Sequence, residues 1–96
     1  MAELRLTPAA LRDLEDIWRH TAQRWGVAQA ERYIDQLNAC FEVLVQAPFS
    51  APACDHIRPG YRRQPVERHV VYYRTGQDRV DVVRILHERM DAPRHL

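Results

Sequence analysis

The fold is decided by residues 69–87, which read His-Val-Val-Tyr-Tyr-Arg, then Thr-Gly-Gln-Asp, then Arg-Val-Asp-Val-Val-Arg-Ile-Leu-His. The first and third pieces are rich in β-branched and aromatic residues, which favour strands. The middle piece holds a glycine among polar residues, which is typical of a turn. These residues therefore predict a β-hairpin, and the strand-like run Tyr61 to Val66 before it adds a third strand.

Helical patterns precede these strands. Glu3 to Leu6 alternates as a short strand, and Thr7 and Pro8 then suit the N-cap and the first turn of a helix. Gly26 is placed where a glycine ends a helix. The predicted core stripe of this first helix consists of Leu11, Leu14, Trp18, Thr21, Ala22 and Trp25.

A second helix is predicted from Val27 to Ala47, where Pro48 follows it. Its predicted core stripe consists of Ala30, Tyr33, Ile34, Leu37, Phe41 and Leu44. Two helices with almost no linker form an antiparallel hairpin. The order β-α-α-β-β-β therefore predicts a single α+β domain over residues 1–96, with a helical hairpin packed on one face of a small antiparallel sheet.

The basic residues of the chain are all arginines. The 96 residues carry a net charge of +1, with 14 arginines and no lysine. The absence of lysine excludes Schiff-base chemistry and lysine-assisted phosphate cleavage. The second half of the chain, with nine arginines against six acids, is the more basic one. This excess alone does not indicate nucleic-acid binding.

The cysteines and the first residues of the chain bear on cofactors and on cellular location. Cys40 and Cys54 imply no disulfide framework, and Cys54-Asp55-His56 fits no structural zinc spacing. We therefore expect no metal and no cofactor. Met1 to Glu3 is followed by no signal-peptide segment, and no stretch is long and apolar enough to span a membrane. We expect a cytoplasmic protein without membrane contacts.

Four segments, in order and at matching spacings, resemble the ParE toxins. The first runs from Leu6-Thr7-Pro8-Ala9-Ala10 through Asp13-Leu14-Glu15-Asp16-Ile17-Trp18 to Trp25-Gly26. The others are Ile57-Arg58-Pro59-Gly60-Tyr61-Arg62, His69-Val70-Val71-Tyr72-Tyr73-Arg74, and Val83-Arg84-Ile85-Leu86-His87-Glu88-Arg89-Met90-Asp91 with His95-Leu96. The resemblance covers nearly the whole chain and implies the same sheet-and-hairpin fold.

This resemblance implies a function as well. ParE toxins are the toxic half of type II toxin–antitoxin modules, which include plasmid-stabilisation systems. They inhibit DNA gyrase by trapping it on cleaved DNA, and a ParD-like antitoxin neutralises them in a hetero-oligomer. The RelE toxins of the same superfamily cleave messenger RNA on the ribosome, and that activity is the first alternative. A toxin-derived binding module that has lost toxicity is the second.

Basic and imidazole groups near the end of the chain are the candidate contacts with the target. They are Arg84, His87, Arg89, Arg94 and His95. A protruding basic tip suits contact with gyrase or, indirectly, with its DNA phosphates, although a solvated terminus has the same composition. Strand alternation places Arg84 opposite Val83 and Ile85. We expect it on the open face of the sheet, in a basic stripe with Arg62 or Arg74.

Apolar residues beside the helix stripes are the candidate contacts with the antitoxin. Ile17, Ala39 and Val43 widen the apolar surface beyond what one sheet covers. We expect them to receive an antitoxin segment in the helix-in-groove manner. Arg62 and Arg74 are assigned to the same partner. Scattered surface hydrophobic residues are the alternative interpretation.

RNA cleavage requires a general base, a general acid and cationic stabilisation of the phosphate. By resemblance to the RelE branch, His69 and Arg89 stand where that branch has arginines, and His95 stands where it has a tyrosine. Two histidines and an arginine suit acid–base chemistry. The sequence shows no assembled nucleophile, metal constellation or phosphate loop, so we expect a toxin that acts by binding, without catalytic residues.

Overall fold

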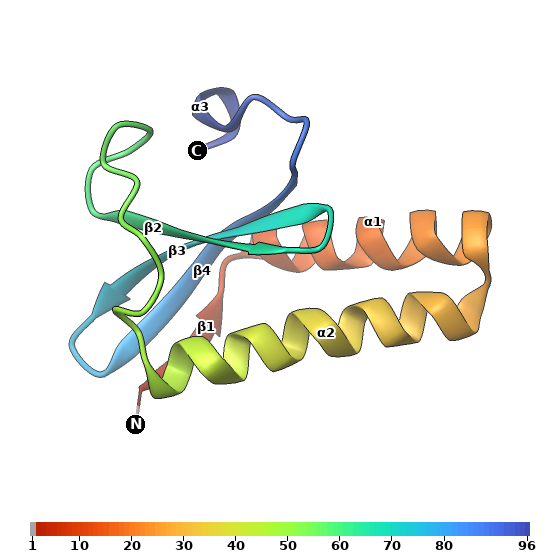
Figure 1. Ribbon diagram of the computed structural model, residues 1–96, viewed down its shortest axis with the longest axis horizontal. Helices are drawn as coiled ribbons and strands as arrows, with labels where there is room; N and C mark the ends of the chain where they lie inside the picture. Colours follow the sequence, from red (N-terminus) through yellow and green to blue (C-terminus); the bar gives the residue numbers. More distant parts are fainter. Residues whose placement is uncertain (1) are drawn as a thin grey trace.

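The computed structural model describes residues 2–96, and its elements follow the predicted order β-α-α-β-β-β, with one short helix added after the last strand (Figure 1). Met1, which the predicted domain includes, lies outside the described residues. The elements are β1 (Glu3–Leu6), α1 (Pro8–Trp25), α2 (Val27–Gln46), β2 (Tyr61–Val66), β3 (His69–Gly76), β4 (Arg79–His87) and α3 (Ala92–His95). The predicted α+β class is confirmed.

The sheet is mixed, so the prediction of an antiparallel sheet is wrong for one strand. Its order is β1-β4-β3-β2, with antiparallel β2–β3 and β3–β4 pairs and a parallel β1–β4 pair. The amides of Glu3 and Thr7 donate to the carbonyls of Asp78 and Val82, at 2.7 and 3.0 Å. The chain between β1 and β4 includes both long helices, so it is long enough to bring β1 beside β4 in the same direction.

Local capping signals in the sequence are confirmed at both ends of α1. The Thr7 hydroxyl accepts a hydrogen bond from the Ala10 amide at 3.0 Å and donates one to the Val83 carbonyl at 2.7 Å. Thr7 therefore caps the helix and attaches its start to β4. Gly26 joins α1 to α2 with φ at +96°, a conformation that other residues rarely adopt.

The face that α1 buries differs from the predicted one. Ala10 and Ile17 are buried, whereas Trp18 and Trp25 of the predicted stripe are 39% and 66% exposed. Leu14 of the predicted stripe does pack against this core, whereas the tryptophans lie along one flank of the helix. The stripe of α2 is confirmed, because Ala30, Leu37, Phe41 and Leu44 are buried and Tyr33 and Ile34 are half-buried.

A β-bulge in β4 changes which side chains face the helices. Tyr72 pairs with Arg84 and Tyr73 with Val82, so Val83 has no partner on β3. Val82 and Ile85 consequently both belong to the core beneath the helices, while Leu86 belongs to a second core on the opposite face. Simple alternation does not hold across such a bulge.

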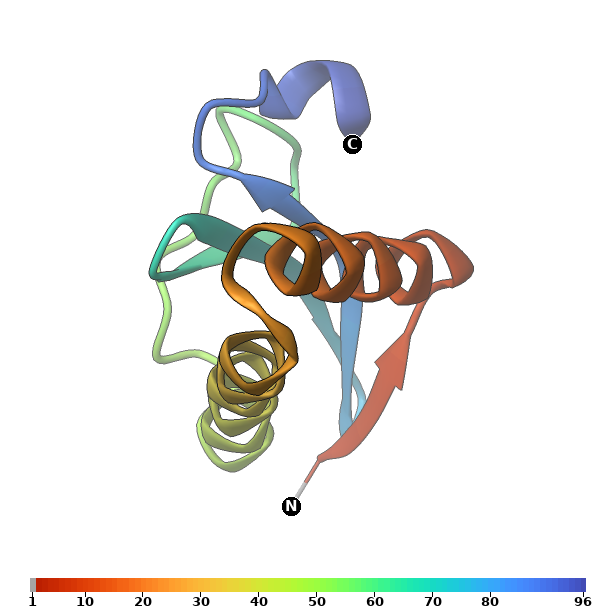
Figure 2. The same ribbon diagram turned by 90° about the vertical axis from the view of Figure 1, so that its right-hand side faces the viewer.

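Both faces of the sheet are therefore covered, not one. Figure 2 shows the two long helices in front of the sheet. On the other face, a second core unites Cys54 of the loop after α2, Tyr61 of β2 and Ala92 of α3. Within residues 2–96, neither long helix is apolar enough over its length to cross a membrane.

Candidate functional site

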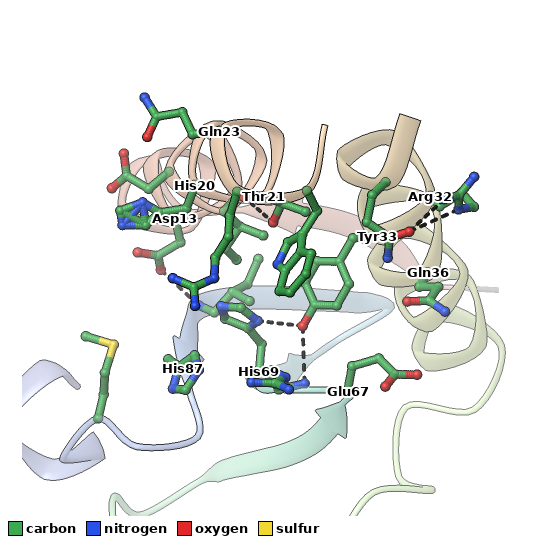
Figure 3. Close-up of a pocket in the computed structure, with 18 of the residues that line it drawn as sticks. Asp13, His20, Thr21, Gln23, Arg32, Tyr33, Gln36, Glu67, His69 and His87 are labelled. Carbon is green, nitrogen blue, oxygen red and sulfur yellow. Dashed lines mark hydrogen bonds between the residues drawn. The ribbon is translucent and has the colours of Figure 1, made fainter. Parts of the chain in front are cut away.

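A wide groove lies between the helical hairpin and the adjoining ends of β3 and β4, with a volume of about 1590 Å³ (Figure 3). Most of the residues that line it have polar side chains, and they include Asp13, His20, Tyr33, Glu67, His69 and His87. These side chains come from α1, α2, the β2–β3 turn, β3 and β4. The fold thus gathers titratable groups that are far apart in the sequence.

A hydrogen-bonded cluster in this groove is centred on the Tyr33 hydroxyl and includes His69. Nδ1 of His69 is 2.6 Å from the hydroxyl oxygen of Tyr33, as Figure 3 shows. The same hydroxyl accepts a hydrogen bond from the Arg68 amide at 3.2 Å. The ring of His87, which pairs with His69 across the two strands, stands edge-on with its centroid 5.3 Å away. Nδ1 of His87 accepts a hydrogen bond from the Arg89 amide at 3.1 Å.

The surroundings of His69 and Tyr33 shift the pKa of both side chains. Burial, reinforced by the nearby His87, lowers the pKa of His69 from 6.5 to about 4, although Asp13 and Glu88 act in the opposite direction. Burial likewise raises the pKa of Tyr33 above 10.0, against the effect of the Arg68 amide. At neutral pH, His69 is therefore uncharged and Tyr33 keeps its proton.

Arg84 does not lie on an open face with Arg62 or Arg74, so that expectation is wrong. Its Nε and Nη2 donate to the two carboxylate oxygens of Asp13 on α1, at 2.8 and 2.9 Å. The side chains of Arg84 and Asp13 are only 23% and 12% exposed. Hydrogen bonding to Asp13 raises the pKa of Arg84. The charge of Arg84 is thus neutralised within the protein. Arg84 pairs with Tyr72 of the second core, and its guanidinium reaches Asp13 at the edge of β4 that β1 leaves uncovered after Val82.

The other candidate target contacts do not form one cluster. His87 is half-buried in the groove, whereas Arg89, Arg94 and His95 are exposed and are not part of the groove lining. Arg94 pairs with Asp91 at 3.6 Å. The three residues considered for RNA cleavage are separated in the same way, since His69 lines the groove and Arg89 and His95 do not.

The candidate antitoxin contacts separate into buried and exposed residues. Ile17 is 7% exposed and packs in the core, so its prediction as a surface residue is wrong. Ala39 and Val43 lie exposed on α2. Nη1 of Arg62 donates to the Ala51 carbonyl at 2.7 Å, which ties Arg62 to the loop after α2, and Arg74 lies exposed over the Tyr61 ring.

Sequence reasoning missed an exposed apolar stripe along α1. Leu11, Trp18 and Trp25 are all exposed, and they repeat every seven residues, which places them on one flank of the helix. Asp13 and His20 lie on the flank that borders the groove, and Trp25 at the end of the stripe also lines it. The seven-residue spacing was visible in the sequence, but two neighbouring apolar stripes on one helix leave open which of them faces the sheet.

This arrangement of helical hairpin and mixed sheet is shared with a chain in the solved structure titled "Chromosomal ParDE TA system from P. aeruginosa". The two agree with a TM-score of 0.80 at 21% identity, over 91% of this chain and 96% of that chain. The fold is therefore of the class of small α+β proteins found in toxin–antitoxin systems.

Sequence comparisons define the family. The family described as "ParE toxin of type II toxin-antitoxin system, parDE" matches residues 4–92. Toxin ParE1 of Mycobacterium tuberculosis is 48% identical over 92 residues, covering 95% of this chain and 94% of that protein. Toxin ParE1 of Caulobacter vibrioides is 43% identical over 96 residues, covering 100% of this chain and 99% of that protein. The chain belongs to the ParE toxin family.

Proposed function

We propose that this toxin acts in the cytoplasm by binding DNA gyrase and inhibiting it, and that a ParD-like antitoxin neutralises it. Family membership supports the antitoxin, because the family is named for the parDE pair. The proposal of gyrase as target rests on the resemblance to ParE toxins. The structure bears on a narrower question, which is whether the groove offers acid–base chemistry.

The lowered pKa of His69 and its bond to Tyr33 support the proposal that the toxin binds its target and does not cleave RNA. A general acid or base is most effective when its pKa lies near the working pH. His69 has its pKa lowered to about 4, and its Nδ1 is engaged by Tyr33. Arg84, the cation nearest to that cluster along β4, is neutralised by Asp13. This favours a binding role over RNA cleavage.

The proposed target surface consists of exposed basic and imidazole groups on and near α3. Arg89, Arg94 and His95 are exposed there, and His87 adds an imidazole at the edge of the groove. Such groups suit contacts with a protein surface or with phosphates of DNA held by it. Arg84 is left out of the direct contacts because its guanidinium is already bound.

The proposed antitoxin surface is the stripe of Leu11, Trp18 and Trp25 on α1, with Ala39 and Val43 of α2 as further contacts. An amphipathic antitoxin segment laid on the hairpin buries these apolar side chains. Arg74 remains a proposed polar contact. Arg62 has to release the Ala51 carbonyl before it binds a partner, so we give it a minor role.

A supercoiling assay with purified gyrase tests the target. Inhibition by the isolated toxin, relieved by the antitoxin, is the expected result. Cleavage of ribosome-bound messenger RNA without gyrase inhibition would instead identify a ribonuclease. Antitoxin binding without growth arrest on induction would identify a non-toxic binding module.

Titration of antitoxin against single variants tests the antitoxin surface. Trp18→Arg should weaken binding at least tenfold, roughly the effect of losing a buried aromatic anchor. Val43→Arg should weaken it less. Gln23→Arg changes an exposed residue on the groove side of the same helix and serves as the control. Unchanged affinity of folded Trp18→Arg and Val43→Arg variants removes the proposed surface.

A further inference from the structure

Arg84 connects three separate parts of the molecule. Two of its nitrogens bind the Asp13 carboxylate of α1, and Nη1 donates to the carbonyl of His95 in α3 at 3.2 Å. Asp13 also accepts a hydrogen bond from the Ile85 amide of β4 at 2.9 Å. The guanidinium therefore lies between the helical hairpin and the end of the chain that carries the proposed target contacts.

The short edge strand makes this contact possible. The last residue of β1, Leu6, pairs with Val82, so the edge of β4 beyond Val82 has no strand beside it. Asp13 accepts a hydrogen bond there from the Ile85 amide. An aspartate with three donors in place, and a side chain only 12% exposed, is held in one position.

The α3 helix is docked against the body of the protein, not solvated as an ordinary tail. Ala92 is buried and Leu96 packs against the second core. Nη1 of Arg58, from the loop that lies near α3 in Figure 1, donates to the Leu96 carbonyl at 2.5 Å. Two guanidinium groups thus bind the carbonyls of His95 and Leu96, which have no partner within a helix that short.

We propose that Asp13 and Arg84 are positioning residues that fix α3, and with it Arg94 and His95, in the orientation that meets the target. The role in target contact rests on the proposed function, whereas the positioning of α3 does not. The pair touches no partner itself. It links α1 and β4 to α3, which is too short a helix to hold its orientation by itself.

Substitution is a sharper test than deletion, because removing α3 uncovers the second core. Arg84→Lys keeps the charge but lacks the fork that binds Asp13 and His95 together. Arg58→Gln weakens the docking of α3 without touching Asp13. Val80→Ala, in the first core, is the control that lowers stability while leaving every contact of α3 intact.

Hydrogen exchange and inhibition are measured on the same samples. In Arg84→Lys and Arg58→Gln, exchange at the amides of Arg94 and Leu96, which donate to Asp91 and Ala92, should rise about tenfold. The concentration of toxin for half-inhibition of gyrase should rise by about the same factor, with antitoxin affinity unchanged. Val80→Ala should lower the melting temperature without either effect.

Two results overturn the inference. The first is wild-type exchange at α3 in Arg84→Lys. The second is undiminished inhibition of gyrase by a variant in which the amides of α3 exchange their hydrogens freely. Should the wild type inhibit neither gyrase nor growth, the proposed function fails, and the exchange measurements still decide whether Arg84 holds α3.

Discussion

Protonation of His69 should make the stability of this toxin depend on pH in a defined window. The folded pKa of His69 is about 4, compared with 6.5 for the free side chain. Between these two values the unfolded chain binds a proton that the folded protein does not bind. Stability from this group is therefore fully present above about pH 6.5 and is lost progressively as the pH falls toward 4.

The magnitude follows from the size of the shift. A difference of about 2.5 pH units corresponds to roughly 3 kcal/mol of unfolding free energy. A domain of this size has about 5–15 kcal/mol in total, so the loss is a large fraction of its stability. Its physical origin is the cost of placing a charge on a ring that is partly removed from water and lies beside His87.

Urea unfolding at intervals from pH 4 to 8 measures this loss in the wild type and in His69→Gln. Glutamine keeps a polar group beside Tyr33 but does not titrate. The wild type should therefore lose about 3 kcal/mol more than the variant across the window. Val71→Ala, a core change without a titratable group, should run parallel to the wild type. An NMR titration that finds the His69 pKa above 6 refutes the reasoning and reopens acid–base chemistry in the groove.

Three further substitutions test the framework of the fold. Thr7→Ala removes the cap of α1 and its bond to Val83 and should cost about 1–2 kcal/mol, measured by thermal unfolding. Gly26→Ala meets no atom within 4 Å, yet should cost roughly 1–2 kcal/mol in urea unfolding because of its φ of +96°. Tyr73→Phe leaves the Pro48 carbonyl without its donor at 2.9 Å and should cost about 1 kcal/mol in the same assay.

Features set by neighbouring residues were predictable from the sequence. The capping of α1 by Thr7, the break at Gly26 and the extent of α2 all depend on local conformational preference. The core stripe of α2 was predictable because it is the dominant apolar stripe on that helix. On α1 two apolar stripes compete, and only packing against the sheet decides between Ile17 and Trp18.

Features that depend on long-range pairing were not predictable. The parallel pairing of β1 with β4 depends on which strands are neighbours in the sheet. Alternation places Arg84 opposite Ile85, as its pairing with Tyr72 of the second core also does, but its bond to Asp13 depends on where β1 ends beside β4. The pairing of His69 with His87 depends on the register of the β3–β4 hairpin, which the bulge also shifts.

Several polar groups of the groove are already bonded within the protein, and this favours a toxin that binds its target. One ring nitrogen of His69 is bonded to Tyr33, and one of His87 accepts the Arg89 amide. Among residues 2–96, every buried side-chain nitrogen or oxygen has a hydrogen-bond partner. Acid–base catalysis needs a group that exchanges a proton with the substrate near the working pH. Among the exposed guanidinium and imidazole groups, those of Arg89, Arg94 and His95 lie on α3 and the turn before it, where they suit contact with a macromolecule.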